Sequence, residues 1–103
     1  MNVDAVRNLL SEQLASEAPR SNLHGCDLEE CLVEPQLEEF LATPKEAPKF
    51  ELWVVLEERP DTRDGYKIAL DPDTAVFCLA YGSQPGASYV GHYGTFWDAF
   101  DAM

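Results

Sequence analysis

The side chains best suited to nucleophilic chemistry are three cysteines and two histidines, and some of them lie close together in the sequence. His24, Cys26 and Asp27 are near neighbours and are the residue types of a base, a nucleophile and an orienting acid. Catalytic trios are assembled in space from separate elements, and three neighbours in one loop rarely converge on one atom. The stretch therefore predicts a loop thiol. A small enzyme that uses the His24/Cys26 loop, or His92, stays open as an alternative.

Metal and nucleotide sites are disfavoured by spacing. The spacing of Cys26 and Cys31 matches neither a CxxC redox motif nor a usual zinc pair, and His92 lies far from both. The glycines of the second half form neither GxGxxG nor a phosphate-binding loop. We therefore expect no metal, no other cofactor and no catalytic residues. Cys78, in an apolar run, is typical of a small buried side chain.

The net charge is the abnormal property of the composition. Nineteen acidic against seven basic residues give −12, which repels nucleic-acid phosphates and anionic lipids and favours a basic protein partner. Three carboxylate pairs stand out: Glu29-Glu30, Glu38-Glu39 and Glu57-Glu58. Neighbours in a strand point to opposite faces, so each pair predicts an acidic surface rather than a general acid and base.

Candidate partner-binding residues come from the acidic segment and from the C-terminal aromatic residues. Tyrosine and tryptophan are enriched in the centres of protein interfaces, and Trp97 lies off the apolar stripe of the C-terminal segment. The predicted contact residues are Glu29, Glu30, Glu38, Glu39, Tyr89, Tyr93 and Trp97. The oligomeric state stays open.

Length and composition indicate one globular domain over residues 1–103, with 46% apolar and 25% charged residues. Apolar runs such as Leu52 to Leu56 are far too short to span a membrane. The odd number of cysteines and a start with neither a basic nor an apolar leader region predict a reduced, cytoplasmic protein.

Helical periodicity predicts an N-terminal helix that begins after Asn2 and ends before Pro19, with Asn2 as its N-cap. Residues 26–42 fit a helix or strands. Pro35 forbids one continuous helix, so we favour a short strand at Cys31 to Val33 and another extended piece after Pro35.

The second half indicates an antiparallel meander. Phe50 to Leu56 is β-branched and aromatic, residues 65–81 form a hairpin, and Tyr89 to Tyr93 is a last strand. Thr95 and Asp98 predict a capped C-terminal helix. The expected class is α+β: an N-terminal helix, an open antiparallel sheet of about four strands with an exposed edge, and a short C-terminal helix.

Several stretches carry a resemblance: residues 23–35, Leu52 to Glu58, Gly65 to Ile68 and Gly91 to Phe96. Together they resemble a group of short, uncharacterised acidic bacterial proteins. In size, charge and architecture this group is similar to immunity proteins that neutralise bacterial toxins, which implies protein binding and transfers no site residues.

The function expected from these features is non-enzymatic binding in a bacterial cytoplasm, as an immunity-type inhibitor of a basic toxin domain. A toxin that cleaves nucleic acid must bind phosphate and is therefore basic, so an acidic inhibitor is steered toward it. Two alternatives remain: the small enzyme named above, and a structural or housekeeping domain whose charge of −12 serves solubility only.

Overall fold

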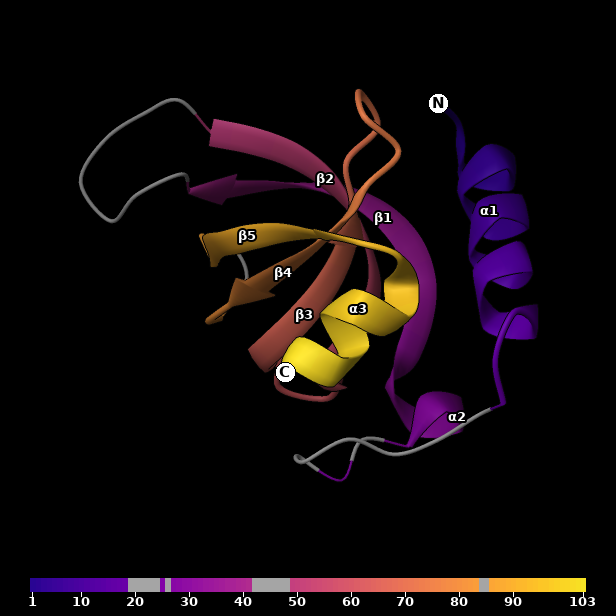
Figure 1. Cartoon of the computed structure of the whole chain (residues 1–103). Coiled ribbons are helices and arrows are strands. Elements are labelled where there is room, and N and C mark those ends of the chain that lie inside the picture. Colours follow the sequence, from indigo (N-terminus) through magenta and orange to yellow (C-terminus); the bar gives the residue numbers. More distant parts are fainter. Residues whose placement is uncertain (19–24, 26, 42–48, 84–85) are drawn as a thin grey trace.

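The computed structural model describes residues 1–18, 25, 27–41, 49–83 and 86–103 (Figure 1). In order, the elements are α1 (Val3–Ala15), α2 (Leu28–Cys31), β1 (Leu32–Leu41), β2 (Lys49–Arg59), β3 (Asp64–Leu70), β4 (Phe77–Tyr81), β5 (Ser88–Gly94) and α3 (Phe96–Ala102). The α+β class and both terminal helices are confirmed, and the sheet has five strands. No helix in these ranges is long and apolar enough to cross a membrane.

The strands form a closed barrel in the order β1-β2-β3-β4-β5, so the predicted open sheet is wrong. Consecutive strands are antiparallel, whereas β1 and β5 close the barrel in parallel at Leu41 and Ser88. The Leu41 N–H donates to the Ala87 carbonyl at 3.0 Å. Register shifts in the β1–β2, β2–β3 and β4–β5 pairs increase the coiling of the sheet, which brings its two edges together.

The stretch whose sequence fits either a helix or strands contains both. One helical turn, α2, is capped by the Asp27 side chain, and β1 then runs through Pro35. Pro35 lies within the register shift between Leu32 and Gln36, where a residue without an N–H costs no ladder hydrogen bond. The preference for strand was right for 32–41, but Cys31 belongs to the helix.

The barrel interior is a small apolar layer that no helix covers. Its buried residues are Phe40, Leu52, Val54, Ala69, Cys78, Ala80 and Ala87. They come from β1 to β4 and the residue before β5, and they are buried without any helical neighbour in the cluster. Four of the seven are alanine or cysteine. Small side chains suit the narrow space inside a barrel of five strands.

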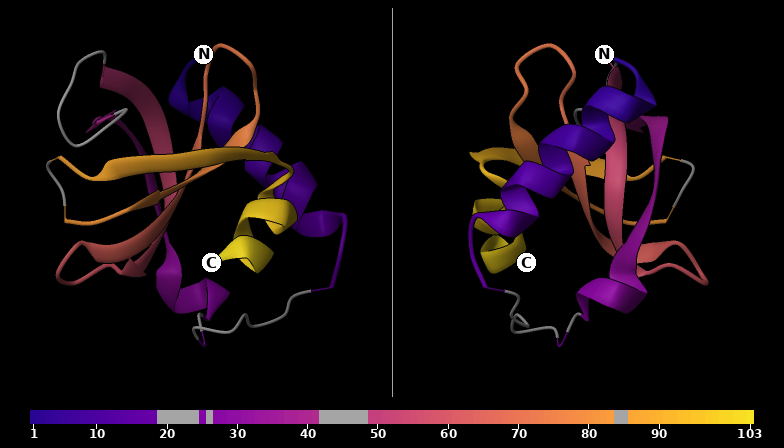
Figure 2. Two further views of the ribbon diagram at one scale, coloured as in Figure 1. Left: turned by 60° about the vertical axis from the view of Figure 1, so that its left-hand side comes forward. Right: turned by 90° about the vertical axis from the view of Figure 1, so that its right-hand side faces the viewer.

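The outer face of the barrel is covered by the helices. Val6 and Leu10 of α1 pack with Phe96, Trp97 and Phe100 of α3 against β2, β3 and β4. Gln13 joins the two helices: its side-chain oxygen accepts from the Phe96 N–H at 3.0 Å and its carbonyl from Trp97 Nε1 at 2.8 Å. Figure 2 shows the two helices together on one side of the barrel. The predicted Thr95–Asp98 capping box is present.

Candidate functional site

Polar side chains close the barrel interior at both ends of β3. Lys67 and Ala69 share the interior face, and Lys67 is fully buried. Asp71 follows the other end of β3. The apolar layer therefore separates a group of charges around Lys67 from a hydrogen-bonded group around Asp71. We call these the charged end and the histidine end of the barrel.

At the charged end, Lys67 is held by backbone carbonyls. Its Nζ donates to the carbonyl of Arg63 at 2.7 Å and to that of Gly82 at 2.6 Å, and lies 3.7 Å from Glu57 Oε2. Burial lowers the pKa of Lys67, against the attraction of the nearby Glu57 carboxylate. The ammonium ties the β2–β3 turn to the segment after β4.

Arg63 completes the charged end. Its guanidinium donates to Glu38 of β1 and, at 3.1 Å, to both carboxylate oxygens of Glu57 of β2. The hydrogen bond to Glu38 is the main reason that the pKa of Arg63 is raised. Arg63 has a φ of 59°, a left-handed conformation that non-glycine residues seldom adopt. The turn therefore takes up a strained backbone where its arginine bridges two strands.

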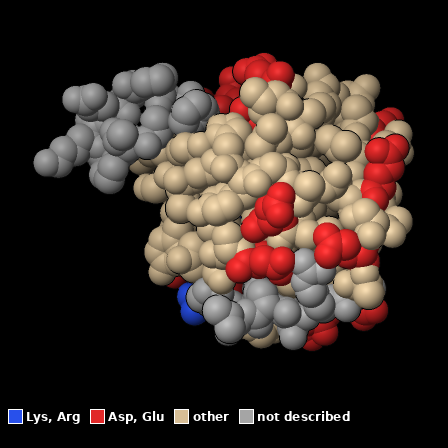
Figure 3. All heavy atoms as spheres, viewed as in Figure 1, with Lys and Arg blue, Asp and Glu red and all other residues tan. Residues whose placement is uncertain are grey.

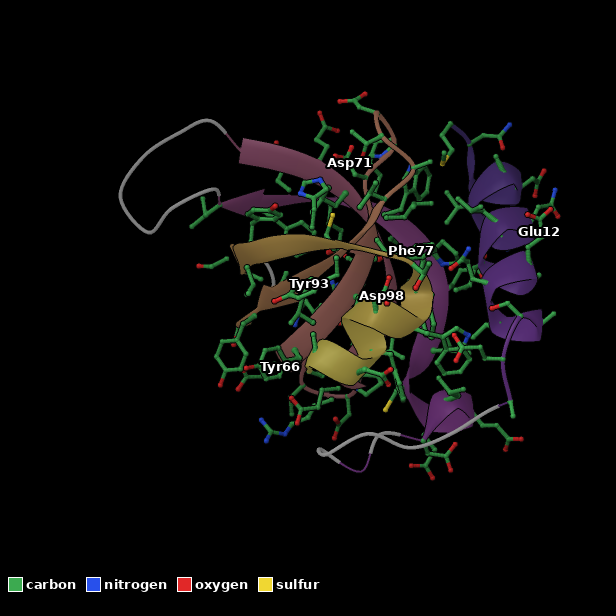
Figure 4. All side chains as sticks on the ribbon, in the orientation of Figure 1. Glu12, Tyr66, Asp71, Phe77, Tyr93 and Asp98 are labelled. Atoms are coloured by element: carbon green, nitrogen blue, oxygen red, sulfur yellow. The ribbon has the colours of Figure 1, made fainter. Side chains whose placement is uncertain are left out.

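At the histidine end, three side chains from the β3–β4 connection and β5 form a hydrogen-bonded chain. His92 Nε2 lies 2.8 Å from Asp71 Oδ2, and His92 Nδ1 contacts the Tyr89 hydroxyl. With a neutral ring, Nε2 donates to the carboxylate and Nδ1 accepts from the phenol. Figure 4 shows Asp71 at the end of the barrel away from Tyr66.

The environment of the histidine end keeps Tyr89 protonated and Asp71 ionised. Burial is the main cause that raises the pKa of Tyr89, which opposes a phenolate nucleophile. Burial also acts to raise the pKa of Asp71, but hydrogen bonds from His92, the Asp73 N–H and Thr74 hold it below its ordinary value. Burial raises the pKa of Cys78 to about 12, so this thiol is not nucleophilic at neutral pH.

The outer face of β3, β4 and β5 carries aromatic residues beside α3; Tyr66 is partly buried there, and Tyr81 and Tyr93 are exposed. The rings of Tyr66 and Tyr81 meet edge to face with centroids 4.8 Å apart, and Tyr81 is 51% exposed. On β5, Val90 is 48% and Tyr93 40% exposed. We call Tyr66, Tyr81, Val90 and Tyr93 the tyrosine strip.

The four predicted acidic contact residues divide between two environments. Glu29 and Glu30 are exposed on α2, and Glu39 is exposed on β1. Glu38 instead points toward the interior, where its side chain is 18% exposed and bound to Arg63. Three of these acids therefore lie at the surface, and Glu38 belongs to the charged end.

The predicted aromatic contact residues also lie apart. Tyr93 is exposed, while Tyr89 is partly buried against the interior layer and bound to His92. Trp97 is only 2% exposed and packs against Phe96 and Phe100. Trp97 is therefore not placed at the surface as a contact residue would be, because it packs between α3 and α1, where its Nε1 donates to the Gln13 carbonyl.

Most residues of these groups are not among the predicted contact residues, and Lys67, Asp71 and Tyr81 show why. The alternation of Tyr66, Ile68 and Leu70 with Lys67 indicates a strand with one wet face, so Lys67 was expected in water. Asp71 was assigned to a turn, and nothing in the spacing joins it to His92. The alternation correctly places Tyr81 on the same face as Leu79. It does not show that the Tyr81 side chain is exposed while that of Leu79 is buried.

The His24/Cys26 loop cannot be placed, since both of these residues lie outside the described ranges. Within those ranges, no group of three or more His, Cys, Asp or Glu side chains could hold a metal ion. Comparison with known proteins finds no matching family model, no matching curated protein and no matching solved structure. The functional argument therefore starts from the charges and exposed rings of this chain.

Proposed function

We propose that the protein binds a basic protein partner in a bacterial cytoplasm, as an immunity-type inhibitor of a basic toxin domain. The observation that supports it is the distribution of charge. Every cation whose side chain the structure describes lies within 4.0 Å of a carboxylate: Arg7 with Asp4 and Glu34, Arg59 with Asp64, Arg63 with Glu38 and Glu57, and Lys67 with Glu57. The acids beyond these pairs leave the surface strongly negative.

The β1–β2 surface carries part of this negative charge. Glu39 and Glu51 are directly opposite each other across the two strands, and both are exposed. A basic partner would be attracted to this surface from a distance of about 8–10 Å at physiological salt.

The test uses the protein product of the gene adjacent to this one, with association kinetics at two salt concentrations. Replacing Glu29, Glu30 and Glu39 by Gln removes three exposed charges of the predicted surface. The matched control removes three exposed charges elsewhere through Glu12→Gln, Asp61→Asn and Asp73→Asn. We expect the on-rate to fall several-fold more in the first variant and to fall with salt in the parent.

Two results would overturn the proposal. If no adjacent gene product binds, the immunity role is lost. If the on-rate is independent of salt and of both triple variants, the charge serves solubility only, which is the housekeeping alternative.

The enzyme alternative gains one specific observation, the Asp71–His92–Tyr89 chain. A histidine oriented by a carboxylate is the arrangement of a general base. The raised pKa of Tyr89 works against it as a nucleophile, and the binding function therefore has more support. If an activity is found, we expect His92→Ala to change it by no more than a few fold, whereas a loss of about 10³-fold would favour the enzyme.

A further inference from the structure

We propose that the tyrosine strip is the contact surface for arginine side chains of the basic partner. This inference rests on the proposed function and adds to it a location and a chemical preference. The strip crosses three neighbouring strands on the outer face of the barrel, beside the part that α3 covers. It is distinct from the acidic residues of α2 and β1.

The strand register makes the strip continuous. Tyr66 of β3 is paired with Tyr81 of β4, and Tyr81 is paired with Ser88 at the start of β5. Leu79, two residues before Tyr81 on the same face, is paired with Gly91. The Tyr93 ring lies over Gly91, within 3.5 Å of where a Cβ would stand. The rings of β3, β4 and β5 therefore follow one another across the sheet.

Two irregularities of β5 expose the end of the strip. The register of β4 and β5 shifts between Phe77 and Cys78 and again between Leu79 and Ala80, which leaves Tyr93 and Val90 as the extra residues. A bulge of this kind re-aims a side chain. Because β5 is already paired with β4 and with β1, we expect a partner to contact side chains here and not to add a strand.

Carboxylates lie next to the backbone that carries the rings. Glu58 accepts from the Tyr66 N–H at 3.0 Å. At the other end, Asp98 of α3 lies within 3.1 Å of the position that a Cβ on Gly94 would take. Figure 4 shows Tyr66, Tyr93 and Asp98 on one face of the molecule. In Figure 3 that face shows acidic side chains among uncharged ones, with blue only at its lower edge.

A guanidinium fits this combination of rings and carboxylates. It stacks on an aromatic face and donates planar, bidentate hydrogen bonds to a carboxylate, which a lysine ammonium cannot do in the same way. A second copy of this chain is a poor occupant, because each copy carries a charge of −12. Nucleic acid is repelled for the same reason. Charge and ring geometry thus point to arginine on a protein.

The test uses two peptides in place of the unidentified partner: acetyl-Gly-Arg-Gly-Arg-Gly-amide and the same peptide with lysine. Each is titrated into the full chain at low salt while NMR follows the tyrosine ring signals. We expect the arginine peptide to bind at least about threefold more tightly and to shift the signals of Tyr66, Tyr81 and Tyr93. Equal binding of both peptides without ring shifts would overturn the proposal.

Variants locate the binding. Tyr81→Ser with Tyr93→Ser should weaken the arginine peptide about tenfold, while Tyr81→Phe should retain most of the affinity because the ring remains. Leu37→Ser is the matched control: Leu37 is 45% exposed on β1, away from the strip. Thermal melting checks that each variant is folded. An unchanged affinity in the folded double tyrosine variant, or an equal loss in Leu37→Ser, would contradict the strip.

The two proposals fail in different ways. If the double tyrosine variant binds both the peptide and the adjacent gene product as the parent does, while the Glu29, Glu30 and Glu39 variant slows association, the strip is wrong and the function stands. If the arginine peptide binds the strip but no adjacent gene product binds, the guanidinium site stands without the immunity role.

Discussion

The two ends of the barrel interior are closed by different chemistry. At the charged end, Lys67 is fully buried and the Glu57 side chain is 5% exposed, so both charges have left water. At the histidine end, His92 is 33% and Asp71 13% exposed, and water still reaches the chain. Removing one partner from a buried charge group leaves the others uncompensated, whereas an exposed hydrogen-bonded chain can exchange its partners for water.

The two ends should therefore differ in what they contribute to the free energy of unfolding and in how they respond to pH. Lys67, Arg63, Glu38 and Glu57 connect β1, β2, β3 and the segment after β4 at one end. Asp71, His92 and Tyr89 connect only the β3–β4 connection and β5. We therefore expect the charged end to dominate the free energy of unfolding, and the histidine end to change with protonation.

Lys67→Met should produce the largest effect. The change removes the donor to the carbonyls of Arg63 and Gly82 and the cation beside Glu57, so we expect a loss of about 3–5 kcal/mol in the free energy of unfolding. Urea denaturation measures it. The double variant with Glu57→Gln should recover part of the loss. A single-variant loss below about 1 kcal/mol would show that Lys67 is not needed to hold this end.

The second prediction compares the free energies of unfolding of two variants, Glu38→Gln and its matched control Glu39→Gln. The two residues are neighbours that point to opposite faces of β1. Glu38 is bound to Arg63, and its loss should cost about 1–2 kcal/mol. Glu39 is exposed and faces Glu51, so its neutralisation should stay within about 0.5 kcal/mol. Equal losses in the two variants would mean that the bond between Glu38 and Arg63 adds nothing to the free energy of unfolding.

Local sequence signals predicted the two terminal helices and the hairpin well. The Thr95–Asp98 capping box and the pairing of Tyr66 to Leu70 with Phe77 to Tyr81 depend on residues close in sequence, and both are confirmed. Closure of the barrel was not predictable in the same way. It depends on the meeting of Leu41 with Ser88, from strands at opposite ends of the sheet order. Ala69, Cys78 and Ala80 on one face were a signal for a narrow interior that periodicity alone does not use.

The candidate site was predicted only in part for the same reason. Charge identified Glu29, Glu30 and Glu39 as surface residues, because an acidic side chain is mostly exposed to water whatever the fold. Lys67 was assigned to water because alternation assumes that one face of a strand is wet. In a closed barrel the inner face is buried, and a lysine on that face must find its partners across the interior.

The acid dependence of stability tests the histidine end. Hydrogen bonds outweigh burial and lower the folded-state pKa of Asp71. A lowered carboxyl pKa adds stability that is present in full above the unfolded value of about 3.9 and is lost as pH falls through the folded value. Asp71→Asn should therefore reduce the free energy of unfolding by about 1 kcal/mol at pH 7 and make its decline below about pH 4 shallower. Exposed Asp73→Asn, the matched control, should leave both unchanged within about 0.5 kcal/mol.

His92→Ala should have a small effect, far below that of Lys67→Met. It removes the contacts to Asp71 and Tyr89, but Asp71 keeps the hydrogen bond from the Asp73 N–H at 2.9 Å, and water can reach the vacated positions. We expect a loss of about 0.5–1.5 kcal/mol in the free energy of unfolding, measured by urea denaturation at pH 7. With Asp71→Asn already present, the same change should cost less, because the two side chains share one hydrogen bond. A loss as large as that of Lys67→Met would show that the two ends are equivalent, and that water does not replace the partners of an exposed chain.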